Sequence, residues 1–229
     1  VRAAVAFVSG VQESYGYKVG IIAQPDWKDK ESIQVLGRPR LGFLVSAGNM
    51  DSMVNHYSVS KRRRDKDSYT PGGVMGKRPD YAAVVYCNLI RSVYKDIPIV
   101  IGGIEASLRR AAHYDYWSDS LKPSVLVDSG ADLLTYGMGE RVVLDIARAM
   151  HNGYNLNLLR KLRQVAFLAD DRYVDSLGDE ALRLHGFEKC LKDRRAFGEN
   201  FVRIETESNR MQAATLVEPV GDRFVVVNP

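Results

Sequence analysis

The sequence predicts an α/β fold: an open parallel sheet flanked by helices, followed by a mixed extension. Short, near-continuous apolar runs alternate with segments of helical periodicity, which is typical of βαβ units. Such apolar runs fit strands that are covered on both faces of a parallel sheet. The 229 residues are 45% hydrophobic and 26% charged, which fits a globular core and excludes a disordered chain.

The predicted elements follow a βα rhythm through the first half of the chain. A helix that stops at Gly16 precedes a buried strand over Lys18–Ala23. The further expected strands are Leu41–Ala47, Ile97–Ile101 and Asp132–Tyr136, and the expected helices are Asp80–Tyr94, Glu105–Arg110 and Glu140–Met150. We therefore expect a Rossmann-like domain over residues 1–153.

The remaining residues, 154–229, do not repeat this rhythm. Residues 155–171 fit a short helix or strand, and residues 177–200 fit one helix or two. Phe224–Val227 fits a strand close to the end of the chain. We expect this extension to pack on the first domain or on something downstream.

Charge and cysteine content restrict the class of protein. The formal net charge of +4 is too small to identify a nucleic-acid binder by itself. Cys87 and Cys190 are the two cysteines, and they form neither a disulfide framework nor a CxxC site, which fits the cytoplasm. No apolar run approaches the roughly 18 residues that span a bilayer. The chain begins at Val1 without a signal peptide, and we interpret it as part of a longer protein.

Two glycine turns follow predicted strands. Gly102-Gly103 precedes a helix, and Gly137 and Gly139 lie just before Glu140 at the start of the next one. Turns at the carboxyl ends of parallel strands are where such sheets bind ligands. The alternative is a tight turn that needs a positive φ. The second turn lacks the third glycine of a dinucleotide fingerprint, so a nicotinamide cofactor is not expected.

The densest gathering of polar and aromatic residues follows the first glycine turn. The candidate residues there are Glu105, Arg109, Arg110, His113, Asp115, Trp117 and Asp119. They could perform acid–base work or hold a metal, or form a polar network that holds the loop over Trp117. His56, His151 and His185 have no evident partner. Since no Ser-His-Asp set, P-loop or HExxH is present, we predict neither a catalytic residue nor a metal site within this chain.

A basic run precedes this region. Lys61, Arg62, Arg63 and Arg64 lie in a long stretch of weak periodicity. They could contact a polyanion such as RNA, or they could belong to a solvated loop.

Several strings in the sequence resemble one family. They are GIIAQPDW (20–27), AGNMDSM (47–53), SYTP (68–71), GKRPD (76–80), GGIEASLRR (102–110), HYDYWSD (113–119) and VVVNP (225–229). Together they resemble the N-terminal region of YgiQ-type radical SAM proteins, densely over residues 16–150 and loosely beyond. The closing string is similar to the stretch just before the radical SAM core of that family.

The resemblance implies a [4Fe-4S] cluster, held by a CxxxCxxC motif, that binds S-adenosylmethionine in a core absent from this chain. Neither cysteine of this chain corresponds to a cluster ligand, so the ligands are expected beyond Pro229. The resemblance further implies that the carboxyl edge of the sheet faces the core and helps to hold an unknown substrate. Glu105 and the two arginines at 109 and 110 would position polar or anionic groups there.

Two alternatives stay open. The region also resembles the cobalamin-binding domains that precede many radical SAM cores, but it lacks their Asp-x-His-x-x-Gly motif, so bound cobalamin is not expected. The chain could instead be a stand-alone module that binds RNA, or a cobalamin or nucleotide. We expect a cytoplasmic accessory domain whose partner is the radical SAM core of the same polypeptide.

Overall fold

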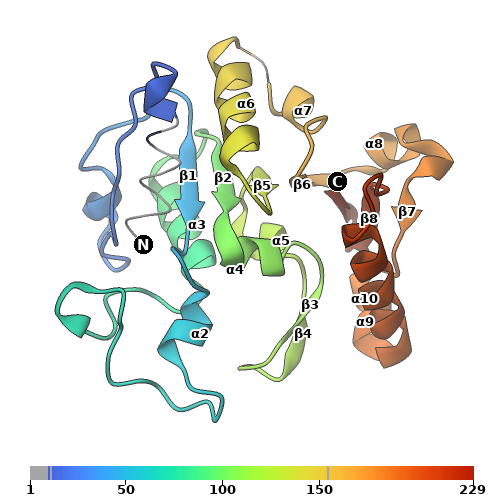
Figure 1. Ribbon diagram of the computed structural model, residues 1–229, viewed down its shortest axis with the longest axis horizontal. Helices are drawn as coiled ribbons and strands as arrows, with labels where there is room; N and C mark the ends of the chain where they lie inside the picture. The colour runs from blue at the N-terminus through green and yellow to red at the C-terminus, as the bar shows by residue number, and fades with distance from the viewer. Residues whose placement is uncertain (1–9, 11, 154) are drawn as a thin grey trace.

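The structure, a computed structural model, describes residue 10, residues 12–153 and residues 155–229. Its centre is a seven-stranded sheet with the order β1-β2-β5-β6-β9-β8-β7 (Figure 1). The strands are β1 (Phe43–Ser46), β2 (Ile99–Gly102), β5 (Leu133–Thr135), β6 (Val165–Ala169), β7 (Leu182–Arg183), β8 (Leu216–Val220) and β9 (Arg223–Val227). β1, β2 and β5 are parallel, β6, β9 and β8 pair antiparallel, and β7 pairs parallel with β8. The predicted α/β class, with a parallel sheet and a mixed extension, is confirmed.

Helices cover both faces of the sheet. The helices of the described residues are α2 (Ser52–His56), α3 (Ala82–Val93), α4 (Gly103–Leu108), α5 (Val125–Ser129), α6 (Glu140–His151), α7 (Leu156–Leu159), α8 (Asp171–Ser176), α9 (Phe187–Lys192) and α10 (Arg194–Ser208), with 3-10 turns η1 (Lys30–Ile33), η2 (Pro71–Gly73) and η3 (Gly178–Glu180). Of these, α2 lies beyond the end of β1 (Figure 1). A second, two-stranded sheet is the hairpin of β3 (His113–Asp115) and β4 (Ser120–Lys122).

Alternate strand residues point into two cores, as the pleat requires. Ile99 and Ile101 of β2 pack with α3 and α5, whereas Val100 packs with α6 on the other face. The extension uses the same two cores, because Val225 joins the first and Val226 joins the second. Residues 165–227 thus continue the sheet of the first domain, and a boundary at residue 153 stays a prediction.

The expected strand over Lys18–Ala23 is wrong. These residues have no ladder partner and run as an extended segment, with Ile21 exposed. A short apolar run indicates burial, but it does not indicate whether a neighbouring strand is available for pairing. The helix expected before Gly16 lies partly outside the described residues; residues 12–14 are helical, and Gly16 has a φ of +85°.

The extension differs in detail from its prediction. Residues 155–171 contain both α7 and β6, whereas one element was expected. Residues 177–200 contain β7, α9 and the first half of α10, which continues to Ser208. β7 is two residues long and is defined by its pairing with β8, so local periodicity did not indicate it.

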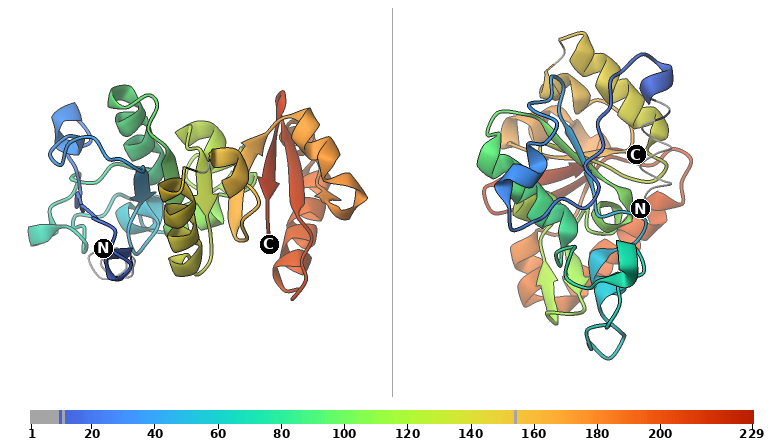
Figure 2. Two further views of the ribbon diagram at one scale, coloured as in Figure 1. Left: turned by 90° about the horizontal axis from the view of Figure 1, so that it is seen from above. Right: turned by 90° about the vertical axis from the view of Figure 1, so that its left-hand side faces the viewer.

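The carboxyl ends of the parallel strands carry the long connections. The segment between β1 and α3 and the β3–β4 hairpin both extend beyond the ends of β1 and β2 (Figures 1 and 2). The sheet twists strongly, so that β8 and β9 lie across the direction of β1 in the view from above (Figure 2). Pro229 lies close to the end of β5. Its carbonyl accepts a hydrogen bond from the Gln164 amide, and the Gln164 carbonyl accepts one from the amide of Tyr136, which follows β5.

Position 103 requires glycine because the backbone there is crowded between β1 and β2. Its φ is +83°, and a Cβ at this position would lie 2.6 Å from Ser46 Oγ. We expect Gly103→Ala to lower the free energy of unfolding by about 2 kcal/mol, because strain and a clash add. Gly198→Ala in exposed α10, where a Cβ meets nothing within 4 Å, should raise it by about 0.5–1 kcal/mol. Urea unfolding measures both, and equal effects would contradict the crowding at Gly103.

Candidate functional site at the carboxyl edge of the sheet

Glu105 joins three helices at this edge. It lies in the first turn of α4 and is 1% exposed. Its Oε2 accepts a hydrogen bond from the Ser52 amide at 2.7 Å, and its Oε1 accepts one from the Ala83 amide at 2.9 Å. These amides belong to the first turns of α2 and α3, which otherwise lack acceptors. Glu105, a predicted site residue, thus links α4 to the first turns of α2 and α3, and both of its carboxylate oxygens are used in doing so.

A buried ion pair lies next to it. Asp51 begins α2 and accepts hydrogen bonds from the amides of Met53 and Val54, and its other oxygen accepts one from Arg109 Nη1. Burial opposes the charge of Arg109, but the hydrogen bond to Asp51 and the negative charges of Asp51, Glu105 and Asp115 together outweigh burial and raise the pKa of the guanidinium. Arg109 therefore stays charged beneath the surface, with its charge balanced by Asp51.

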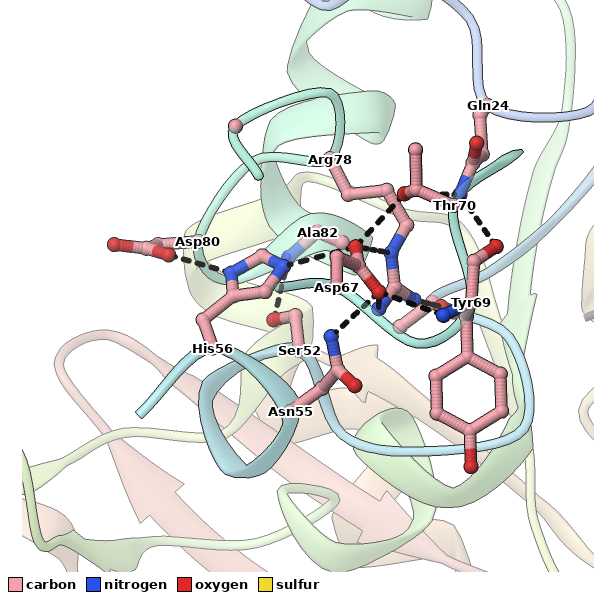
Figure 3. A network of polar contacts seen from close by, with 12 residues as sticks. Gln24, Ser52, Asn55, His56, Asp67, Tyr69, Thr70, Arg78, Asp80 and Ala82 are labelled. Carbon is pink, nitrogen blue, oxygen red and sulfur yellow. Dashed lines mark hydrogen bonds and ion pairs between the residues drawn. The ribbon is translucent and has the colours of Figure 1, made fainter. Parts of the chain in front are cut away.

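A second buried network folds the long connection (Figure 3). Arg78 donates to both oxygens of Asp67, at 2.8 and 3.0 Å. Asn55, Thr70 and the Tyr69 amide each donate to the same carboxylate at 2.9 Å. Burial alone would raise the pKa of Asp67, but these donors, Arg78 first, hold it well below its usual range. The charge of Asp67 is thus satisfied inside the fold.

His56 belongs to this network, although the sequence offered it no partner. Its ring is buried, with Nδ1 2.7 Å from Asp80 Oδ1 and Nε2 3.8 Å from Asp67 Oδ2 (Figure 3). The Tyr57 hydroxyl donates to Asp80 Oδ2 at 2.7 Å. The expectation for His185 was also wrong, since its Nε2 lies 2.6 Å from Glu199 Oε2.

The hairpin is anchored by Asp115. Its buried Oδ2 accepts hydrogen bonds from the Tyr81 hydroxyl at 2.8 Å and from the Ser118 amide and hydroxyl. Burial raises the pKa of Asp115, but these donors outweigh it and the pKa is lowered. The neighbouring residues Tyr114 and Tyr116 are 52% and 41% exposed, as the alternation of a strand requires.

Three residues of the predicted site keep buried polar atoms without a hydrogen-bond partner among the described residues. They are Asp115 Oδ1, Arg109 Nε and Trp117 Nε1. His113 lies in the same hairpin, with Nδ1 3.2 Å from the Ala111 carbonyl, and burial lowers its pKa, which favours the neutral ring. Such atoms require water or a polar ligand group as a partner.

The basic run and the hairpin meet. Lys61 Nζ donates to the Trp117 carbonyl at 3.4 Å and lies 4.8 Å from the centre of the Tyr116 ring. The Tyr116 hydroxyl donates to the Val59 carbonyl at 2.5 Å. We define the basic–aromatic surface as the exposed residues Lys61, Arg62, Arg63, Arg64, Tyr114 and Tyr116. Asp119, with a φ of +52°, accepts a hydrogen bond from the Tyr114 hydroxyl at its margin.

The remaining predicted residues lie at the Tyr136 turn. The Arg110 guanidinium lies 5.0 Å from the centre of the Tyr136 ring and donates to the Ser107 carbonyl at 2.8 Å. Gly102 ends β2, where a Cβ would lie 2.8 Å from Thr135 Oγ1. Gly137, with a φ of +69°, lies just before Gly139 and Glu140 at the start of α6. These glycines fit a tight turn; ligand binding by them stays a prediction.

Sequence reasoning missed Glu218 of β8. It is 2% exposed, its Oε2 accepts a hydrogen bond from the Ala112 amide at 2.8 Å, and its Oε1 has no partner among the described residues. Burial raises its pKa to about 7, and the nearby Glu188 adds to the effect. A lone acid in a strand of the extension carries no local signal, because Ala112 lies more than 100 residues away in sequence.

The cysteines do not fit a cluster site. Cys87 lies in α3 and Cys190 in α9, and both are buried as free thiols. Burial raises the pKa of each thiol, to about 12 for Cys87, which disfavours the thiolate that metals bind. Across the part of the chain that the structure describes, no group of three or more His, Cys, Asp or Glu residues could hold a metal ion. The chain's two cysteines are fewer than the three thiolates that the expected cluster motif supplies.

Comparison with known proteins places the chain in a family. The family model described as "Radical SAM N-terminal" matches residues 2–229. The chain is 51% identical over 223 residues to a UPF0313 protein of Clostridium perfringens and 44% identical over 224 residues to one of Clostridium botulinum. These alignments cover 97% and 98% of this chain but 33% and 34% of those proteins. No solved structure matches.

The fold and the comparisons define the class as an N-terminal domain associated with radical SAM proteins. The chain belongs to the radical SAM N-terminal family, and within it the chain is similar to the UPF0313 proteins. The chain spans about a third of the length of the curated relatives it matches.

The role of Glu105 can be tested by Glu105→Gln. The amide nitrogen of glutamine would face one of two backbone amides that now have a carboxylate acceptor. We expect the free energy of unfolding to fall by about 2 kcal/mol. Glu31→Gln on the exposed turn η1 should change it by less than about 0.5 kcal/mol. Urea unfolding measures both; equal small effects would show that Glu105 does not join the helices.

Glu218 predicts a pH dependence. The folded state holds its proton up to a pKa of about 7, whereas the unfolded chain releases it near 4.5. Its contribution to stability is therefore full below pH 4.5 and is lost as the pH rises through 7. We expect the stability of the wild type relative to Glu218→Gln to fall by up to about 3 kcal/mol over this interval. Denaturant unfolding across pH measures this, and a difference independent of pH would refute it.

Proposed function

We propose that this chain is the accessory, substrate-side domain of a radical SAM protein whose core lies in the same polypeptide. The observation that carries the proposal is the family match over residues 2–229 in a chain that covers a third of its relatives. The core would bind the [4Fe-4S] cluster and S-adenosylmethionine, since this chain's residues do not fit a cluster.

The geometry of the sheet edge supports a substrate-side role. The carboxyl edge of an open parallel sheet is where ligands bind, because loops and helix N-termini converge there. In this chain, two buried charge networks, around Asp51–Arg109 and around Asp67–Arg78, hold the connecting loops at that edge. In the β3–β4 hairpin at this edge, buried polar atoms of Asp115 and Trp117 have no hydrogen-bond partner among the described residues.

The position of Pro229 fits a core at this edge. The Tyr136 hydroxyl donates to the Asn228 carbonyl, so the last residues lie against the turn that follows β5. The Asn228 side-chain amide donates to the carbonyls of Arg160 and Leu162, at 2.6 and 2.9 Å, which fixes the direction of the chain. Residues 228–229 thus lie beside the start of β6 and the turn after β5, at the edge that carries the loops described above.

The alternative of a stand-alone module is not favoured by the comparisons, because the matched relatives are about three times as long. Cobalamin has no support from an Asp-x-His-x-x-Gly motif. Among the described residues, no helix is long and apolar enough to cross a membrane. Two free, buried thiols suit a reducing compartment, and we place the protein in the cytoplasm as part of this proposal.

Anaerobically reconstituted full-length protein tests the proposal. We expect about four irons per polypeptide and reductive cleavage of S-adenosylmethionine. The double variant Cys87→Ala/Cys190→Ala should retain both, because these thiols are buried away from any cluster. Circular dichroism would verify that the variant folds. Absence of iron from the wild type would overturn the proposal, and loss of iron from the folded double variant would show that this chain does hold the cluster.

A further inference from the structure

We propose that the basic–aromatic surface binds single-stranded nucleic acid, with its arginines on phosphates and its tyrosines against bases. The inference rests on the proposed substrate-side role, because the surface lies at the same edge of the sheet. It adds the chemical class of what is held there.

The three arginine side chains of the turn, those of Arg62, Arg63 and Arg64, unlike that of Lys61, have no hydrogen-bond or ion-pair partner among the described residues. By contrast, Arg78, Arg91 and Arg109 each pair with an aspartate. Three guanidinium groups are thus available to a partner from outside.

Folding removes negative charge from the exposed surface of the same segment. Asp67 adjoins the basic run in sequence, but it is buried and balanced by Arg78. Within residues 61–67, one carboxylate, that of Asp65, is therefore exposed, whereas five positively charged side chains are exposed. The turn is therefore more basic toward solvent than its sequence indicates.

The backbone of the basic turn is held by hydrogen bonds. The Ser58 amide donates to the Arg62 carbonyl and the Arg64 amide donates to the His56 carbonyl, each at 2.8 Å. Tyr57 and Arg63 form an antiparallel bridge, and Tyr116 anchors the Val59 carbonyl. A solvated loop needs none of these contacts. Because the backbone is already ordered, a ligand would not have to bear that entropic cost.

The aromatic residues favour a single strand over other polyanions. Tyr116 contacts the basic turn through Lys61 and the Val59 carbonyl. Tyr114 lies two residues before it in the same hairpin and is more than half exposed. Exposed rings next to cations form a platform on which unpaired bases stack while phosphates meet the charges. Bases in a duplex are already stacked and do not reach such rings. RNA and single-stranded DNA share this chemistry.

The test measures binding to full-length protein by fluorescence anisotropy, without S-adenosylmethionine or reductant. The probe is a fluorescein-labelled single-stranded RNA of about 12 nucleotides, within the length that one such surface covers. DNA of the same sequence and the RNA duplex are the comparison probes. Three phosphate contacts predict a salt slope of about −2, or roughly a 20-fold loss of affinity between about 50 and 200 mM salt.

The charge-reversal variant Arg62→Glu/Arg63→Glu/Arg64→Glu should lower the affinity at least tenfold. Its matched control, Lys192→Glu/Arg194→Glu/Arg195→Glu, makes the same change in charge on exposed residues of α9 and α10. We expect the control to lose less than about twofold. No binding by the wild type, or equal losses in both variants, would overturn the proposal.

The role of the ring is tested separately. Tyr114→Leu should weaken binding about tenfold, whereas Tyr114→Phe should bind like the wild type, because the ring and not the hydroxyl stacks on a base. Equal affinity for the duplex, or an unaffected Tyr114→Leu, would overturn the single-stranded assignment. Weaker binding to DNA than to RNA would point to RNA as the ligand. Since iron content and cofactor cleavage are not read in this assay, its failure leaves the proposed radical SAM association intact.

Discussion

The carboxylate of Glu105 lies where three helices meet, and the edge of the sheet is organised around it. One oxygen accepts from the first turn of α2 and the other from the first turn of α3, while Glu105 itself belongs to α4. Helix N-termini carry unpaired amides and partial positive charge, so one buried acid stabilises two of them at once. Asp51 at the start of α2 adds the bond to Arg109, which ties the same helix to the end of α4.

The charged residues at this edge fall into two groups, one buried and one exposed. Asp51, Asp67 and Asp115 are buried and hydrogen-bonded, each by residues from a different segment. Arg109 and Arg78 balance the charges of Asp51 and Asp67, whereas Asp115 accepts a hydrogen bond from the neutral Tyr81 hydroxyl. The cations of the turn at residues 61–64 are exposed and form no ion pair with an acid in the part of the chain that the structure describes. This division distinguishes residues that shape the edge from residues free to contact a ligand.

The sequence indicated where residues 102–119 lie in the fold more accurately than it indicated which groups they contact. Residues 102–119 do lie at the carboxyl edge, as strand-to-helix order indicated. Yet Glu105 and Arg109, expected to position substrate groups, are engaged with backbone amides and with Asp51. Residue type and spacing indicate that a charge is present but not whether another charge lies across the fold. The same limit concealed His56, whose partner Asp80 is 24 residues away, and Glu218, whose partner is Ala112.

The sequence by itself determined the α/β class, the strands near residues 43, 99 and 133, and the helices α3 and α6, because each depends on the periodicity of neighbouring residues. Its long motifs also determined the family. The tertiary structure alone decided that β9 lies between β6 and β8, that residues 18–23 form no strand, and that the basic turn meets the aromatic hairpin. Each of these depends on contacts between segments far apart in sequence, and such contacts are selected by the packing of the whole chain.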